Sequence, residues 1–266
     1  MDNLRQDLTI IKIGGNVIDH PASLQHFLEI FAVLPGNKIL VHGGGKIATE
    51  LSTQMGLEAK MVDGRRITDA DTLRMVTMVY GGLINKNLVA QLQSLHCNAI
   101  GLTGADGNMI SAVKRPVKTI DYGFVGDLYE TSIAANSIKS LLESGFVPVF
   151  SAITHDQKGQ LLNTNADTIA SAIAVALAQY YQTSLVYCFE KKGVLKNIDD
   201  EASLIREIRS SEFEGLKEQG IIAGGMLPKL QNAFEAIQKG VKDVYIGKAD
   251  ELCELNGQAF GTRLII

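Results

Sequence analysis

The chain has 266 residues, of which 46% are hydrophobic and 20% are charged, and its formal net charge at pH 7 is −4. This length and composition allow a sizeable core in one large domain or two modest ones, which excludes a disordered protein. The weak negative charge argues against nucleic acid as a partner, and no apolar run approaches the roughly 20 residues of a membrane span.

The N-terminus and the cysteines indicate where the protein works. The first residues lack the basic and apolar regions of a signal peptide. Cys97, Cys188 and Cys253 are far apart, odd in number and in no metal-like spacing, so we expect free thiols in a reducing cytoplasm.

The first predicted unit is a strand over residues 8–13, followed by Gly14 and Gly15 and by a helix over 21–33. Lys12 lies inside this strand. A lysine in a buried strand needs an anionic partner. Because two glycines follow directly, we expect Lys12 to have a functional role. The alternative is a lysine that reaches solvent from an edge strand.

A second unit of the same kind has a strand over 39–41, the stretch His42-Gly43-Gly44-Gly45 and a helix over 46–55. In this layout backbone N–H groups and a helix N-terminus face an anion, and glycines let a phosphate or carboxylate approach closely. The alternative is a plain tight turn. Neither the P-loop pattern nor the dinucleotide fingerprint fits, so a different kind of phosphate site is indicated.

A hairpin follows, because Asp63-Gly64 is a turn signal. Arg65 and Arg66 come next and point to opposite faces of a strand, so one can bind a carboxylate while the other faces solvent. The alternative is that both are solvated. Asp69 is expected to cap a long helix to about residue 95, which Gly81-Gly82 should bend. The apolar stripe of that helix belongs to the core or to a subunit interface.

Asn163, Asn165 and Asp167 form a polar cluster before a nearly all-apolar helix over 166–180. The two asparagines point the same way on an extended segment, and Asp167 lies in the first turn, where the helix dipole favours a carboxylate. Asn165 as an N-cap and Asp167 as a complement to the dipole would account for only part of the cluster.

The remaining strands and helices alternate along the chain. Strands are predicted over 98–102, 109–117, 123–130, 146–150, 185–188, 241–246 and 261–266, and helices from 131 or 132 to 143, over 210–219, and from the glycines at 224–225 to 238. The strands 109–117 and 123–130 form a hairpin outside the sheet. The alternation predicts an α/β fold, a three-layer αβα sandwich with a mainly parallel central sheet.

The candidate residues for phosphoryl transfer are two lysines and one carboxylate, namely Lys12, Lys229 and Asp167. Lys229 lies in the first turns of a helix, where the helix dipole disfavours a cation, so a functional role is indicated. Catalysis of this kind rests on positioning and on neutralising the charge of the moving phosphoryl group, and it needs no nucleophile from the protein.

Five motifs, in order along nearly the whole chain, resemble those of the acetylglutamate kinases of the amino acid kinase superfamily. They are Ile11-Lys12-Ile13-Gly14-Gly15, Val41-His42-Gly43-Gly44-Gly45, Gly64-Arg65-Arg66-Ile67-Thr68, Asn163-Thr164-Asn165-Ala166-Asp167 and Gly224-Gly225-Met226-Leu227-Pro228-Lys229. The first two are shared with aspartate, glutamate 5-, UMP and carbamate kinases. The last three, in this order, are much more specific.

The resemblance implies ATP-dependent phosphorylation of the side-chain carboxylate of an N-acylated glutamate, in arginine biosynthesis. It implies that Lys12 and Lys229 stabilise the transferring phosphoryl group and that Asp167 holds both lysines in place. The acylated amino acid would contact Gly43, Gly44, Arg66, Asn163 and Asn165, with Arg66 on its α-carboxylate. The nucleotide would contact Lys12, Gly14, Gly15, Gly193, Gly225, Met226 and Lys229, and the amides of Gly14, Gly15 and Gly44 would cradle phosphate oxygens.

The resemblance also implies how the chain is divided and what it binds besides. Residues 1–180 would bind the amino acid and form a homodimer, and residues 181–266 would bind ATP, with Mg²⁺ held mainly by the nucleotide and by no metal site of the protein. Arginine-inhibited members carry an extra N-terminal helix that interlaces dimers into a ring. Only about seven residues precede Leu8, so we expect a dimer without that mechanism.

One departure and two alternatives remain. The family usually has Ser or Thr, Asp, a small residue and a glycine before Val-Leu, whereas this chain has Phe189-Glu190-Lys191-Lys192-Gly193, so the Asp position is not clearly filled. A kinase of free amino acids, such as glutamate 5-kinase, is disfavoured by Arg66 and the paired asparagines. A non-catalytic amino-acid sensor is disfavoured by the intact lysines. The sequence leaves acetyl, succinyl and other acyl groups open.

Overall fold

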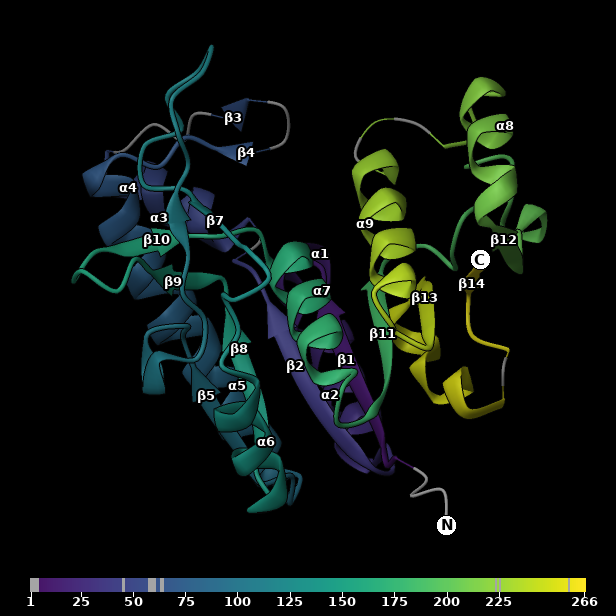
Figure 1. Cartoon of the computed structure of the whole chain (residues 1–266), viewed down its shortest axis with the longest axis horizontal. Helices are drawn as coiled ribbons and strands as arrows, with labels where there is room; N and C mark the ends of the chain where they lie inside the picture. Colours follow the sequence, from purple (N-terminus) through teal and green to yellow (C-terminus); the bar gives the residue numbers. More distant parts are fainter. Residues whose placement is uncertain are drawn as a thin grey trace.

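The structure is a computed structural model that describes residues 5–44, 46–56, 61–62, 65–222, 224, 226–257 and 259–266. Its centre is an eight-stranded sheet (Figure 1). The strands are β1 (Asp7–Ile13), β2 (Asn37–His42), β5 (Ala99–Leu102), β8 (Val147–Ser151), β11 (Gln182–Phe189), β12 (Glu207–Arg209), β13 (Asp243–Lys248) and β14 (Thr262–Ile265). Their order is β12-β14-β13-β11-β1-β2-β8-β5. Only the β13–β14 pair is antiparallel, so the predicted mainly parallel sheet is confirmed.

Helices cover both faces of the sheet. They are α1 (Gly15–Asp19), α2 (Pro21–Val33), α3 (Ile47–Gln54), α4 (Ala70–Val76), α5 (Asn85–Ser94), α6 (Ala135–Glu143), α7 (Ala166–Leu177), α8 (Phe213–Glu218) and α9 (Met226–Gln238), with a π-helix over Thr77–Ile84. The helices α6, α7 and α9 pack together on one face, and α2 and α5 pack on the other (Figure 1). The predicted three-layer αβα sandwich is confirmed.

The central strands are buried on both faces, which explains their nearly continuous apolar sequences. In β1, Ile10, Ile11 and Ile13 are fully buried. The helix α7 crosses this part of the sheet and contacts β1, β2 and β11. Its small buried residues Ala170 and Ala174 allow the close approach.

The sheet grows from β1 in both directions. The chain passes from β1 to β2 on one side, and later returns to place β11 on the other side. Ligands of open α/β sheets bind outside the carboxyl ends of the strands at such a switch point. A ligand site is therefore expected at the residues that follow the ends of β1, β2 and β11.

The long helical stretch after Asp69 is built differently from the prediction. The Asp69 carboxylate accepts a hydrogen bond from the Thr72 N–H, as expected of an N-cap. Gly81 and Gly82, predicted to bend the helix, lie inside the π-helix that joins α4 to α5. The apolar stripe, including Leu73 and Val79, is buried within the chain itself and is part of the core.

Smaller elements also differ from the prediction. The helix expected from residue 131 or 132 begins at Ala135, and the strand β12 was not predicted. The hairpin outside the sheet is present as β6 (Val113–Lys114) and β7 (Gly126–Asp127). Further two-stranded pairs are β3 (Met61–Val62) with β4 (Arg65–Arg66), and β9 (Ile153–His155) with β10 (Leu161–Asn163). The turn predicted at Asp63-Gly64 lies outside the described residues.

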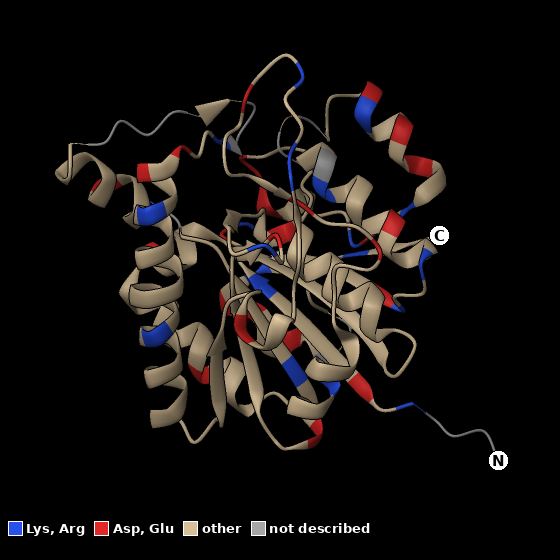
Figure 2. Cartoon of the chain, turned by 60° about the vertical axis from the view of Figure 1, so that its left-hand side comes forward, with Lys and Arg blue, Asp and Glu red and all other residues tan. Residues whose placement is uncertain are grey.

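Figure 2 shows basic and acidic residues interspersed over the elements. None of the described helices is long and apolar enough to cross a membrane. The three cysteines are free, with Cys97 and Cys188 buried and Cys253 exposed.

Candidate active site

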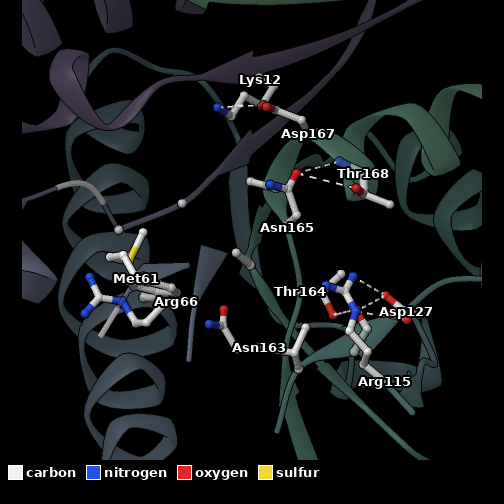
Figure 3. Close-up of a pocket in the computed structure, with 17 residues that line it drawn as sticks. Lys12, Met61, Arg66, Arg115, Asp127, Asn163, Thr164, Asn165, Asp167 and Thr168 are labelled. Atoms are coloured by element: carbon white, nitrogen blue, oxygen red, sulfur yellow. Dashed lines mark hydrogen bonds and ion pairs between the residues drawn. The ribbon is translucent and has the colours of Figure 1, made fainter. Parts of the chain in front are cut away.

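Three charged residues from distant parts of the sequence meet at the switch point. Lys12 comes from β1, Asp167 from the first turn of α7 and Lys229 from the start of α9. The Lys12 Nζ lies 2.7 Å from Asp167 Oδ1, and the Lys229 Nζ lies 3.7 Å from Asp167 Oδ2. Figure 3 shows the Lys12–Asp167 pair. The carboxylate thus lies between the two ammonium groups, in the arrangement that the sequence resemblance implied.

The cluster has an excess of positive charge. Burial alone would raise the pKa of Asp167, but the two lysines outweigh it and hold that pKa below its usual value. Burial lowers the pKa of Lys229, and the Asp167 carboxylate opposes the change. One carboxylate between two ammonium groups leaves a site that favours an additional anion.

A cavity of about 320 Å³ opens beside the cluster. Lys12 and Asp167 line one end, and Arg66 and Asn163 lie at the other (Figure 3). Asn165 lies between these ends in the figure. The predicted substrate residues Gly43, Gly44, Arg66, Asn163 and Asn165 all line the cavity.

Arg66 is held in a way that leaves part of its guanidinium available. Its Nη2 donates to Thr49 Oγ1 of α3 at 2.8 Å. Its Nη1 is buried and has no hydrogen-bond partner among the described residues. A buried donor without a partner is costly, and a carboxylate in the cavity would satisfy it. The side chain of the neighbouring Arg65 is outside the described part.

The two asparagines have different local partners. Asn163 donates from Nδ2 to Thr68 Oγ1 at 3.0 Å. Asn165 accepts at Oδ1 from the Thr168 N–H at 3.0 Å and is the N-cap of α7. The structural role that the sequence offered for Asn165 is therefore real, and the residue still lines the cavity.

The glycine loop after β2 is fixed by its neighbours. A Cβ on Gly44 would lie 1.5 Å from the ring of Tyr80 in the π-helix, so no other residue fits there. The His42 Nδ1–H donates to the Gly43 carbonyl at 2.8 Å, and His42 Nε2 accepts from Asn85 Nδ2 at 3.0 Å. In a trans peptide the N–H points away from the C=O, so holding the Gly43 carbonyl fixes the direction of the Gly44 N–H.

His42 is expected to make stability depend on pH. Its complete burial lowers its pKa from 6.5 to about 4. Between these values the unfolded chain binds a proton that the folded chain does not, so the free energy of unfolding should fall as pH drops from 6.5 to 4, by about 3 kcal/mol. Urea unfolding across this range should show the His42→Asn variant losing less stability than the wild type. His26→Asn, on the exposed side of α2, is the matched control, and equal losses in all three proteins would contradict the assignment.

Several predicted phosphate-binding groups have partners within the chain. The Gly14 N–H donates to the Cys188 carbonyl at 3.0 Å. The first N–H groups of α3 are capped by Asp19, whose carboxylate accepts from the Lys46 N–H at 3.0 Å and the Ile47 N–H at 3.4 Å. The sequence interpretation did not include Asp19, because nothing in its local pattern links it to a helix 27 residues later.

Among the other predicted nucleotide residues, Gly193 and Met226 do not line the cavity. A Cβ on Gly193 would lie 2.5 Å from Thr262 Oγ1, so close packing requires this glycine. Met226 begins α9. Gly225, like Gly45, lies outside the described residues. The nucleotide roles of these residues stay predictions.

An ion pair that the sequence interpretation did not name also lines the cavity. The Arg115 Nε lies 3.0 and 3.1 Å from the two carboxylate oxygens of Asp127. Arg115 directly follows β6 and Asp127 ends β7. Figure 3 shows the pair on the side of the cavity away from Arg66. Asp127 belongs to the stretch Gly-Phe-Val-Gly-Asp at 123–127, whereas Arg115 carries no local signal of its own.

The chain is similar to known proteins in sequence and in fold. Residues 7–248 match the amino acid kinase family. The chain is 56% identical to the acetylglutamate kinase of Cytophaga hutchinsonii, over 98% of this chain and 99% of that one. It is 53% identical to the acetylglutamate kinase of Parabacteroides distasonis, over 97% and 99% of the two chains. Its fold is similar to that of N-acetylglutamate synthase from Neisseria gonorrhoeae, with a TM-score of 0.80 at 19% identity over 98% of this chain and 59% of that one.

Proposed function

The chain belongs to the amino acid kinase family, and on that premise we propose that it phosphorylates the side-chain carboxylate of N-acetyl-L-glutamate with ATP. The products are N-acetyl-glutamyl 5-phosphate and ADP, and the reaction is a step of arginine biosynthesis. The observation that supports this proposal is a cavity with the Lys12–Asp167–Lys229 cluster at one end and Arg66 at the other. These two cationic ends suit the two carboxylates of an acylated glutamate.

The chemistry needs little from the protein beyond charge and position. A side-chain carboxylate oxygen of the substrate attacks the γ-phosphorus of ATP, and the bond from that phosphorus to the bridging oxygen of ADP breaks. The attacking carboxylate is already ionised, so no base has to remove a proton. Lys12 and Lys229 neutralise charge on the moving phosphoryl group, while Asp167 keeps the two lysines together. The Gly44 N–H is a further donor at the reacting end.

We assign the nucleotide to the half of the sheet that begins with β11. Residues 1–180 hold the acylated amino acid and residues 181–266 hold ATP, and this boundary lies between the end of α7 and the start of β11. Gly15, Gly193, Gly225 and Met226 contact the nucleotide, and Gly14 allows its approach. We expect the Mg²⁺ to be held mainly by the phosphates of ATP, because Mg²⁺ in kinases binds the substrate phosphates and takes few ligands from the protein.

Trapping the product tests the proposal. An acyl phosphate reacts with hydroxylamine to give a hydroxamate, so the protein should give one with ATP, Mg²⁺ and N-acetyl-glutamate. Free glutamate and N-succinyl-glutamate are run in parallel. A hydroxamate only with free glutamate would favour a kinase of free amino acids. Binding of N-acetyl-glutamate without any hydroxamate would favour a sensor.

The Arg66→Ala variant is expected to raise the KM for N-acetyl-glutamate about 10- to 100-fold and to change kcat much less. Arg66 contacts the part of the substrate that does not react, so its contribution is the same in the ground state and the transition state. Steady-state kinetics with varied N-acetyl-glutamate gives both constants. Arg74→Ala is the control, because that arginine is exposed on α4 and forms an ion pair with Asp71. A fall in kcat with unchanged KM would place Arg66 at the reacting end instead.

We also propose that the protein is a homodimer. Because the apolar stripe of the long helical stretch is buried within the chain, we place the contact on the apolar residues that this stretch exposes. Met78 is 49% exposed and Leu83 is 47% exposed, and both lie in the π-helix. Light scattering should give twice the chain mass, and Leu83→Glu should shift the protein toward the monomer.

A further inference from the structure

An aromatic ring lies against both lysines of the proposed active site. Phe189 ends β11, and its ring centroid is 3.8 Å from the Lys229 Nζ and 5.6 Å from the Lys12 Nζ. The ring stacks on that of Tyr187, with centroids 6.4 Å apart. It is therefore held by its own strand, at the point where the phosphoryl group is expected.

The charge balance of the cluster explains how the Phe189 ring can stabilise the two ammonium groups. Asp167 is one carboxylate for two ammonium groups, and burial disfavours the charged form of Lys229. Glu190 is a second negative group that acts on Lys229, but among the described residues it forms no ion pair with either lysine. A second carboxylate in direct contact with the lysines would also repel the phosphates of ATP and the carboxylate of the substrate. The face of a phenyl ring attracts a cation through its quadrupole while adding no net charge.

We propose that Phe189 is a positioning residue that holds the Lys229 ammonium group beside Asp167 through a cation–π contact and supports Lys12 in the same way. The proposal rests on the proposed kinase function. The charged groups that face Lys229 are Asp167, Lys12 and Glu190, and the ring adds to their effect.

Fluorination separates the electrostatic contribution of the ring from its packing. Replacing Phe189 by 4-fluoro-, 3,4,5-trifluoro- and pentafluorophenylalanine weakens the negative face stepwise while nearly keeping the shape. We expect kcat to fall with each step, by about 10-fold at pentafluorophenylalanine, with KM changing less than about threefold. The kcat of Phe189→Leu should fall as far as that of the pentafluorophenylalanine variant, and the kcat of Phe189→Tyr should stay within about twofold of the wild type.

The matched control is Phe31, whose ring also carries a lysine, Lys38, at 5.3 Å but lies in α2 away from the cavity. The same fluorinated residues at position 31 should leave kcat unchanged. An NMR measurement tests the contact without using activity: the ε-methylene protons of Lys229, assigned with Lys229→Arg, should lose their upfield ring-current shift in Phe189→Leu.

The outcomes separate the two proposals. Equal kcat across the fluorinated series at position 189, or the absence of the ring-current shift in the wild type, overturns the role of Phe189. Absence of any hydroxamate from the wild type overturns the kinase assignment, whereas the NMR result still reports on the contact.

Discussion

The Lys12→Ala and Lys229→Ala variants are each expected to lower kcat about 100- to 1,000-fold, with smaller changes in either KM. Charge builds up on the phosphoryl oxygens mainly in the transition state, so an ammonium group placed there stabilises that state more than bound ATP. Both ammonium groups are held by Asp167, and neither has to be repositioned when the charge develops. Initial rates of hydroxamate formation with each substrate varied in turn give kcat and both KM values.

A surface lysine supplies the control for these variants. Lys139 pairs with Glu143 at 2.7 Å on α6, the same separation as in the Lys12–Asp167 pair. Lys139→Ala removes an equal charge at a partly exposed surface ion pair, where the loss has little effect on stability, and should leave kcat unchanged. If Lys229→Ala keeps the kcat of the wild type, the phosphoryl group is stabilised by other residues and the assignment fails.

The parts of the site that could be predicted are those with a local signal. Lys12 stands out as a charge inside an apolar strand, and Asp167 stands out in the first turn of an apolar helix. The parallel sheet then brings them together, because the carboxyl end of β1, which holds Lys12, lies beside the start of α7. Strand and helix periodicity was sufficient for this, since continuous apolar strands are typical of a sheet buried on both faces.

The parts that could not be predicted depend on contacts between distant residues. Asp19 caps α3 from another segment, Arg115 pairs with Asp127 across a short hairpin, and Phe189 reaches the lysines only after β11 is placed beside β1. The pair Gly81-Gly82 predicts a bend in the helix, and the structure has a π-helix at these residues. Its form as a π-helix that places Tyr80 against Gly44 follows from packing and not from the glycines alone.

The Asp167→Asn variant is expected to lose activity almost as severely as the lysine variants, about 100-fold in kcat. Asparagine keeps the size of the side chain and removes the charge that keeps two ammonium groups close together. Without that charge, the two lysines repel each other, and no ion pair holds the Lys229 Nζ at 3.7 Å from residue 167. The loss should be in kcat, because Asp167 acts through the lysines and not by binding substrate.

The pH dependence of this variant gives a second readout with a definite sign. Burial lowers the pKa of Lys229 and Asp167 raises it, so removing the carboxylate should lower the pKa of Lys229 further. Lys229 has to be charged to act, and activity is lost as pH rises through its pKa. The alkaline limb of the kcat profile should therefore move to lower pH in Asp167→Asn and stay in place in Asp167→Glu. Combining Asp167→Asn with Lys229→Ala should cost much less than the product of the two single losses, because both changes remove the same interaction. Independent losses and an unmoved alkaline limb would mean that Asp167 serves the fold and not the lysines.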